Sequence, residues 1–144
     1  MNYIITCISH KRHENVESFL EKVGTTNVVF FKTDKELYLE NGAKEVIISG
    51  SLMQSRNASL NYCFSKNKTC IQLSDDLEKI MVNDFTGKRT HQYVCVIDVL
   101  DNILYHFNNS EYMFAGFPPT NNPFFALKEI ELNKFIVGDF IIIK

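Results

Sequence analysis

The first half of the chain alternates short apolar runs with segments whose apolar residues recur every three or four positions. A short apolar run bounded by polar residues is typical of a buried strand, and the longer period is typical of a helix with one buried face. Four strands are predicted, at residues 3–8, 28–31, 45–49 and 69–73. Three helices are predicted between them, at residues 13–23, 34–41 and 51–65. Strands and helices that alternate at this spacing predict a mostly parallel sheet covered on both faces.

The second half follows a different pattern. Residues 79–89 are mixed in character and predict an irregular segment. A long helix over residues 92–107 is indicated by apolar side chains that step by three and four, at Tyr93, Ile97, Leu100, Leu104 and Phe107. Further strands are predicted at residues 114–117, 124–130 and 135–143, with a loop at 118–123. We therefore expect an α/β fold whose back part is mixed and largely antiparallel.

Composition narrows the class of protein. The chain has 144 residues, 45% of them hydrophobic and 22% charged, which is ordinary for one globular domain with a real core. A net charge of −2 gives no general attraction to nucleic acid. No apolar run approaches the roughly 18 residues of a membrane span, and we expect no secretory leader. The four cysteines are widely spaced in apolar contexts, so we expect reduced core residues in a cytosolic protein.

Two adjacent carboxylates, Asp75 and Asp76, follow the fourth predicted strand. They are costly beside a buried strand unless a cation is near, and the carboxyl ends of strands in open α/β sheets are where ligands bind. A divalent metal that carries a diphosphate suits two hard oxygen ligands. An alternative interpretation is that both residues open a helix, with Glu78 in its first turn. The sequence leaves both interpretations open.

Polar residues that could contact a ligand come from three other places. Arg56 shares one face of its predicted helix with Leu52, Leu60, Cys63 and Phe64, so it should lie near the core and need an anion, either a carboxylate or a phosphate. The alternative is that Arg56 extends to solvent or pairs with a structural carboxylate. After the first two strands come Ser9 to Arg12 and Lys32 to Asp34, where His10 could bind phosphate or flank a loop.

These residues resemble a known pattern. The Ser9-x-x-Arg12 spacing, the helix with Ser55-Arg56-Asn57, and the strand ending in Ser74-Asp75-Asp76-Leu77 resemble the nucleotide-sugar-binding half of GT-A glycosyltransferases. The narrower likeness is to small phage-type enzymes that glycosylate modified DNA bases, the group associated with TET/JBP-like oxygenases. The resemblance covers residues 3–77 well and the remainder loosely. A strict Asp-x-Asp motif would require an acid at position 74, where this chain has serine.

The resemblance implies a Rossmann-like GT-A fold and a single domain, with residues 1–77 as the donor-binding half and residues 78–144 as the acceptor-side half. It implies a divalent metal, Mn²⁺ or Mg²⁺, on Asp76 and Asp75. Further donor contacts are implied at Ser9, Arg12, Arg56 and Asn57. The acceptor would be a hydroxyl group, on DNA or another molecule, near Asn121 and Asn122. The chain stops within an apolar run, so we expect a form truncated after Lys144.

Two other functions are compatible with the same pattern. A nucleotidyltransferase shares the sheet and the metal–diphosphate chemistry, but the chain has no Gly-rich start with a nearby lysine. A non-catalytic or degenerate domain that binds a nucleotide sugar needs only the donor half. The location expected for each of these is the cytoplasm, in the host cell if the protein is viral.

Overall fold

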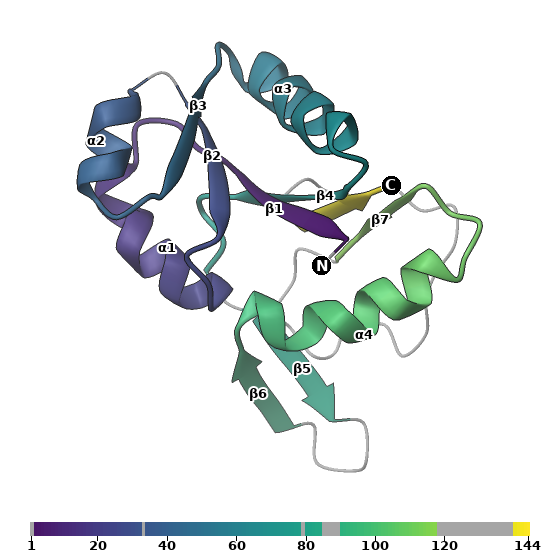
Figure 1. Cartoon of the computed structure of the whole chain (residues 1–144). Helices are drawn as coiled ribbons and strands as arrows, with labels where there is room; N and C mark the ends of the chain where they lie inside the picture. Colours follow the sequence, from purple (N-terminus) through teal and green to yellow (C-terminus); the bar gives the residue numbers. More distant parts are fainter. Residues whose placement is uncertain (1, 33, 79, 85–89, 118–139) are drawn as a thin grey trace.

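The computed structural model describes residues 2–32, 34–78, 80–84, 90–117 and 140–144 (Figure 1). Its strands are β1 (Tyr3–Ile8), β2 (Val28–Lys32), β3 (Glu45–Ile48), β4 (Thr69–Ser74), β5 (Ile80–Asp84), β6 (Thr90–Val94), β7 (Phe114–Gly116) and β8 (Phe140–Ile143). Its helices are the 3₁₀ turn η1 (His13–Asn15), α1 (Val16–Val23), α2 (Lys35–Glu40), α3 (Leu52–Ser65) and α4 (Val96–Asn108). The α/β prediction for the first half is confirmed, with all four strands and three helices in place.

A mixed sheet with the strand order β3-β2-β1-β4-β8-β7 forms the centre of the molecule. The first four strands in this order are parallel, and β8 runs antiparallel to both β4 and β7. The chain builds outward from β1 to β3 and then returns to place β4 on the other side of β1. The strand order therefore reverses between β1 and β4, which is the arrangement of a Rossmann-like sheet.

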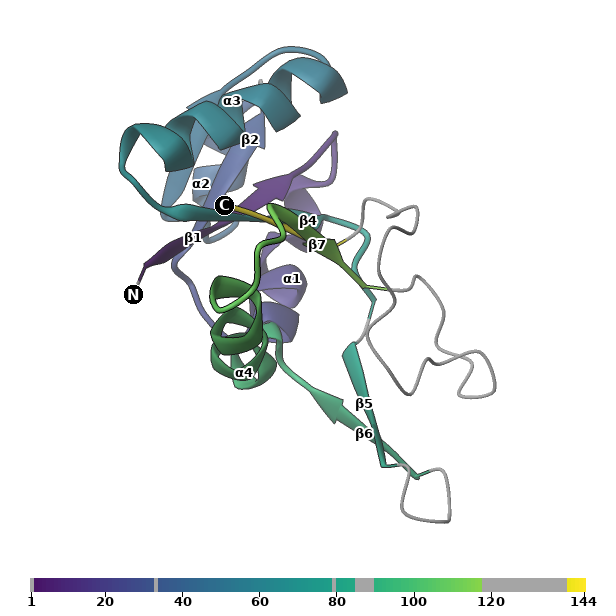
Figure 2. The same cartoon turned by 90° about the vertical axis from the view of Figure 1, so that its right-hand side faces the viewer.

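Helices cover the sheet on both faces, and Figure 2 shows α3 on the side opposite α1 and α4. On the α1 and α4 side, Phe19, Leu100 and Tyr38 pack on the inward residues of the strands in one large cluster. On the other side, Ala58 and Tyr62 of α3 pack on Val29 and Phe31. Each fully buried apolar side chain of this size contributes about 1.5–3 kcal/mol, so both faces stabilise the sheet.

The buried face of α3 differs from the prediction. Leu52 and Phe64 are 64% and 42% exposed, whereas Ser55, Ser59 and Cys63 are buried. The reason is that α3 packs over the buried polar residue Gln72 of β4, whose amide nitrogen donates to Ser59 Oγ at 2.6 Å. Small polar residues satisfy that amide and allow close approach, and apolar periodicity gives no sign of either requirement.

The second half shows two further corrections. The predicted helix over residues 92–107 is wrong at its start, because residues 90–94 form β6 and α4 begins at Val96. The segment expected to be irregular contains β5, which pairs with β6 as an antiparallel hairpin. The strand at 114–116 is confirmed, as is the end of the strand predicted at 135–143. The predicted loop at 118–123 and strand at 124–130 lie outside the described residues.

Within the described ranges, no helix is long and apolar enough to cross a bilayer.

Two glycines give a matched test of the packing between α1 and α4. Gly24 and Gly42 both have a positive φ, 82° and 97°, so alanine at either site should cost about 1–2 kcal/mol in backbone strain. A Cβ at Gly24 would lie 2.7 Å from Cys95 Cβ, while at Gly42 nothing lies within 4 Å. We expect Gly24→Ala to lower the free energy of unfolding by a further ~1–3 kcal/mol from overpacking. Urea unfolding of both variants measures this difference, and equal losses would contradict the described packing.

Candidate functional site

The candidate site lies where the strand order reverses, at the carboxyl ends of β1 and β4. In open α/β sheets, ligands bind in the crevice outside this point. The register pairs Ile8 with Ser74, so the loops that follow the two strands leave the sheet side by side. The loop after β1 carries Ser9, His10 and Arg12, and the turn after β4 carries Asp75 and Asp76.

Asp75 is the centre of the site. Its Oδ2 accepts hydrogen bonds from Ser9 Oγ at 2.7 Å and from the His10 backbone nitrogen at 3.1 Å. Its Oδ1 accepts a hydrogen bond from Arg12 Nη1 at 3.1 Å, and the Asp75 side chain is 12% exposed. A carboxylate offers about four acceptor positions, so three protein donors use most of them. Asp75 therefore ties the β1 loop to the β4 turn.

A second layer of hydrogen bonds lies behind Asp75. The Tyr38 hydroxyl accepts a hydrogen bond from the Arg12 backbone nitrogen at 3.2 Å and also bonds to Ser9 Oγ. Because Ser9 donates its proton to the carboxylate, it must accept from Tyr38. The resulting chain of donors runs from the Arg12 amide through Tyr38 and Ser9 to Asp75.

Burial sets the electrostatics behind the carboxylates. Tyr38 is fully buried, and this burial raises the pKa of its hydroxyl above the ordinary value, partly offset by its bonds with Ser9 and Arg12. Burial also raises the pKa of the Cys7 thiol, and the nearby charges of Asp75 and Asp76 raise it further. Both groups are therefore neutral at pH 7, so neither adds a charge beside Asp75, Asp76 and Arg12.

The backbone of the β1 loop follows an unusual path. Lys11, between His10 and Arg12, has a φ of 56°, which lies in the left-handed region that few residues other than glycine adopt. Such strain persists where the surrounding contacts hold it. Here the flanking residues both donate to Asp75, so the carboxylate stabilises the loop's shape.

Asp76 differs from its neighbour in exposure. Its side chain is 54% exposed, and its Oδ2 lies 3.8 Å from Arg12 Nη1. The Arg12 side chain is 44% exposed, and ion pairs at such sites contribute only about 0–1 kcal/mol. The alternative that these aspartates open a helix is wrong, because they lie in a turn that Leu77 N closes onto Ser74 O, and no helix begins within residues 75–78.

Arg56 occupies a position that the sequence pattern did not anticipate. Its Nη1 donates to Gln72 Oε1 at 3.3 Å, and Gln72 Nε2 donates back to the Arg56 carbonyl oxygen at 2.9 Å. In the described contacts, it is the guanidinium of Arg12 that lies beside the two aspartates. Asn57 is exposed on α3, and donor contacts by Arg56 and Asn57 stay predictions. Asn121 and Asn122 lie outside the described residues.

The donor set constrains what metal could bind. Among the described residues, no three His, Cys, Asp or Glu side chains come together as a metal-binding group. Asp76 has accessible oxygens, and Asp75 has one acceptor position beyond its three bonds. Mg²⁺ commonly binds through one or two carboxylates, several waters and substrate phosphates. The residues present thus fit a cation that arrives with a diphosphate, and they do not form a complete metal cage.

Sequence reasoning missed Tyr38 and undervalued Lys32. Tyr38 is the buried residue of α2, while Leu37 and Leu39 beside it are about 40% exposed, so hydrophobicity ranks these three residues in the wrong order. Lys32 is 4% exposed at the end of β2. The available signal for Lys32 was its place directly after the apolar run Val28–Phe31. A lysine so close to a buried strand is unusual, because buried lysines are rare.

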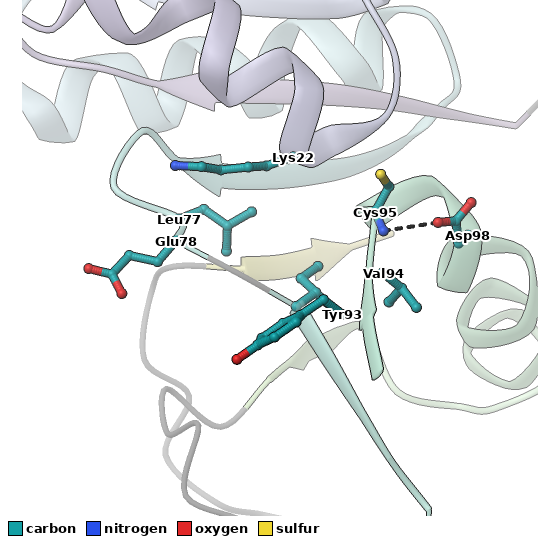
Figure 3. Close-up of a pocket in the computed structure, with 8 residues that line it drawn as sticks. Lys22, Leu77, Glu78, Tyr93, Val94, Cys95 and Asp98 are labelled. Atoms are coloured by element: carbon teal, nitrogen blue, oxygen red, sulfur yellow. Dashed lines mark hydrogen bonds between the residues drawn. The ribbon is translucent and has the colours of Figure 1, made fainter. Parts of the chain in front are cut away.

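A hollow of about 370 Å³ lies just beyond the aspartates, lined by Leu77, Glu78, Tyr93 and Lys22 among others (Figure 3). Leu77 and Glu78 directly follow Asp76 in the chain. The walls are mostly apolar, and the Tyr93 side chain, 61% exposed, forms part of one side. The size and lining of the hollow suit a planar or apolar group.

The buried hydroxyl of Tyr38 gives a direct test of the site's architecture. Tyr38→Phe leaves the Arg12 amide without its acceptor and Ser9 without its donor, so we expect a loss of about 1–3 kcal/mol in unfolding free energy. The matched control is Tyr62→Phe, which removes an exposed bond to Glu45 Oε1 and should cost less than about 1 kcal/mol. Chemical denaturation of both variants checks this, and a Tyr38 variant as stable as the control would overturn the donor chain.

Comparisons with protein-family models, with curated proteins and with solved structures were made for the whole chain. None of the three finds a match. A functional conclusion therefore rests on the residues and geometry at the carboxyl ends of β1 and β4.

Proposed function

We propose that this chain is a metal-dependent glycosyltransferase of the GT-A type, which moves a sugar from a nucleotide-sugar donor to a hydroxyl acceptor. The observation that supports the proposal is the anchored carboxylate of Asp75 at the strand-order reversal, with an exposed acid and an exposed guanidinium beside it. An anion and a cation side by side suit a ligand that brings both a diphosphate and a metal ion.

The contact between Arg12 and Asp76 is weak enough for a ligand to replace it. At 3.8 Å and with both side chains about half exposed, the pair separates at little cost. The guanidinium keeps its bond from Nη1 to Asp75 Oδ1, and its other N–H groups are available to phosphate oxygens, which arginine binds with paired hydrogen bonds. The carboxylate of Asp76 is then available to a hard cation.

The residues would divide the work as follows. Asp76 would hold Mn²⁺ or Mg²⁺, with Asp75 supplying one further oxygen. When bound, the metal offsets charge that develops on the diphosphate leaving group. Ser9, His10 and Tyr38 keep Asp75 and the β1 loop in place, and Arg12 binds the diphosphate. Arg56 and Asn57 on α3 would approach the donor from the other face of the sheet.

The acceptor hydroxyl would lie near the apolar hollow that follows Asp76 in the chain. The apolar hollow that follows Asp76 is the described cavity best placed to receive the part of the acceptor beside the reacting hydroxyl. A modified base of DNA is the narrower candidate, since a planar ring could lie against Tyr93. A cytoplasmic location, in the host cell for a viral protein, completes the proposal.

One observation favours a second candidate function. Position 74 is a serine, and most acceptor positions of Asp75 are taken by protein donors. A domain that binds a nucleotide sugar without transferring the sugar needs no more than this. Binding and turnover must therefore be measured separately.

Nucleotide binding is tested by calorimetry with UDP and GDP in the presence and absence of Mn²⁺. We expect Mn²⁺-dependent binding, and we expect Asp76→Ala to weaken it at least about tenfold, or about 1.4 kcal/mol. Asp101→Ala is the matched control, because Asp101 is an exposed acid on α4. Binding of neither nucleotide, or equal affinity in both variants, would remove the metal-dependent functions.

Turnover is tested by release of free nucleoside diphosphate from a panel of nucleotide sugars, with and without hydroxymethylated DNA. The enzyme proposal expects release that depends on Mn²⁺ and falls at least about tenfold in Asp76→Ala. Tight nucleotide-sugar binding with no release across the panel would favour the binding-domain function instead.

A further inference from the structure

A buried lysine lies next to the candidate site, at the carboxyl end of β2. The side chain of Lys32 is 4% exposed, and its Nζ lies 3.2 Å from His10 Nδ1. The carboxylate of Asp34, whose side chain is 46% exposed, is 3.8 Å from the same ammonium. Within the described residues, His10 is therefore the hydrogen-bond partner of Lys32, and Asp34 balances its charge at longer range.

The contact decides which nitrogen of His10 carries the proton. A lysine ammonium has three donors and no acceptor, so His10 Nδ1 must accept the bond through its lone pair. A neutral imidazole then carries its hydrogen on Nε2. Lys32 thus selects the Nε2–H tautomer of His10.

His10 is also held through its backbone. Its amide nitrogen donates to Asp75 Oδ2 at 3.1 Å, and the residue itself is exposed. The backbone and Nδ1 are thus both engaged with the protein. Nε2–H is the remaining polar group of the ring, and no described residue accepts a hydrogen bond from it. His10 lies in the same loop as Arg12.

The buried charge is not explained by stability. An ammonium removed from water costs several kcal/mol, and a single neutral acceptor with a carboxylate at 3.8 Å repays only part of it. Hydrophobic replacements of buried charges are often neutral or stabilising. Placing a fixed donor at a ligand site is a reason for keeping the lysine.

We propose that Lys32 is a positioning residue that holds His10 as an Nε2–H donor to a phosphate oxygen of the bound nucleoside diphosphate. This inference rests on the proposed function, since it places the diphosphate in the crevice beside Arg12. His10 then contributes a neutral, directional hydrogen bond to the same group that the guanidinium contacts as a charge. Together they distinguish a diphosphate from a smaller or uncharged ligand.

The tautomer is read first, on the ligand-free protein, by ¹H–¹⁵N NMR of the histidine rings. His10 is assigned among the four histidines by comparison with His10→Gln. We expect His10 as the Nε2–H form in the wild type and a tautomer mixture in Lys32→Met. Wild-type His10 with its proton on Nδ1 would overturn the inference, whatever the ligand.

Binding is read next, by calorimetry with UDP or GDP, whichever binds the wild type, and Mg²⁺. His10→Ala should weaken binding about five- to tenfold, the worth of roughly one hydrogen bond. His10→Gln, whose amide nitrogen replaces Nε2–H, should bind within about twofold of the wild type. His10→Asn places its amide nearer to the Nδ1 position and should behave like His10→Ala.

Lys32→Met completes the series. We expect it to fold with unchanged or higher stability and to bind the nucleotide about five- to tenfold more weakly, although Lys32 is buried. Unchanged affinity in His10→Ala, alongside a loss in Asp76→Ala, would overturn this inference and leave the proposed function standing. Absence of binding by the wild type would overturn both.

Discussion

One carboxylate holds the candidate site together. Asp75 accepts hydrogen bonds from a serine hydroxyl, a backbone amide and a guanidinium, all from the loop after β1, while it belongs to the turn after β4. Without it, the two loops at the strand-order reversal would be adjacent but independent. Burial keeps these bonds strong, because water competes less for a carboxylate that is 12% exposed.

The fold follows from the sequence where local rules and tertiary packing agree. The apolar runs of β1, β2 and β4 are buried on both faces, so continuous hydrophobicity identifies them. α1 carries its buried residues Val16, Phe19, Leu20 and Val23 at helical spacing and ends at Gly24 with left-handed geometry. Agreement failed in α3 and at β6. The buried face of α3 consists of Ser55, Ser59 and Cys63, which show no apolar period. In β6, Tyr93 stands at a position that also fits the period of the helix that follows.

The site was predictable in outline. Ser9, Arg12, Asp75 and Asp76 could be proposed because parallel strands bring their carboxyl ends to one edge of the sheet. The separate roles of these residues could not be predicted, because they depend on which acid faces solvent and on which guanidinium lies beside the acids. The local pattern favoured Arg56 as the partner of the aspartates. In the described contacts, Arg56 donates to Gln72 and Arg12 pairs with the aspartates. Tyr38 contributes through burial, which its residue type does not reveal, and the only sign of a buried Lys32 was its place after an apolar strand.

The left-handed backbone at Lys11 limits which residues can occupy this position. A chain reversal at that point lets three donors from one short loop converge on a single acid, and it requires a residue that tolerates a φ of 56°. Asparagine or glycine would adopt this geometry more readily than lysine, whereas valine or isoleucine would resist it. Position 11 therefore tolerates a restricted set of side chains for reasons of backbone shape alone, even though its own side chain is exposed to solvent.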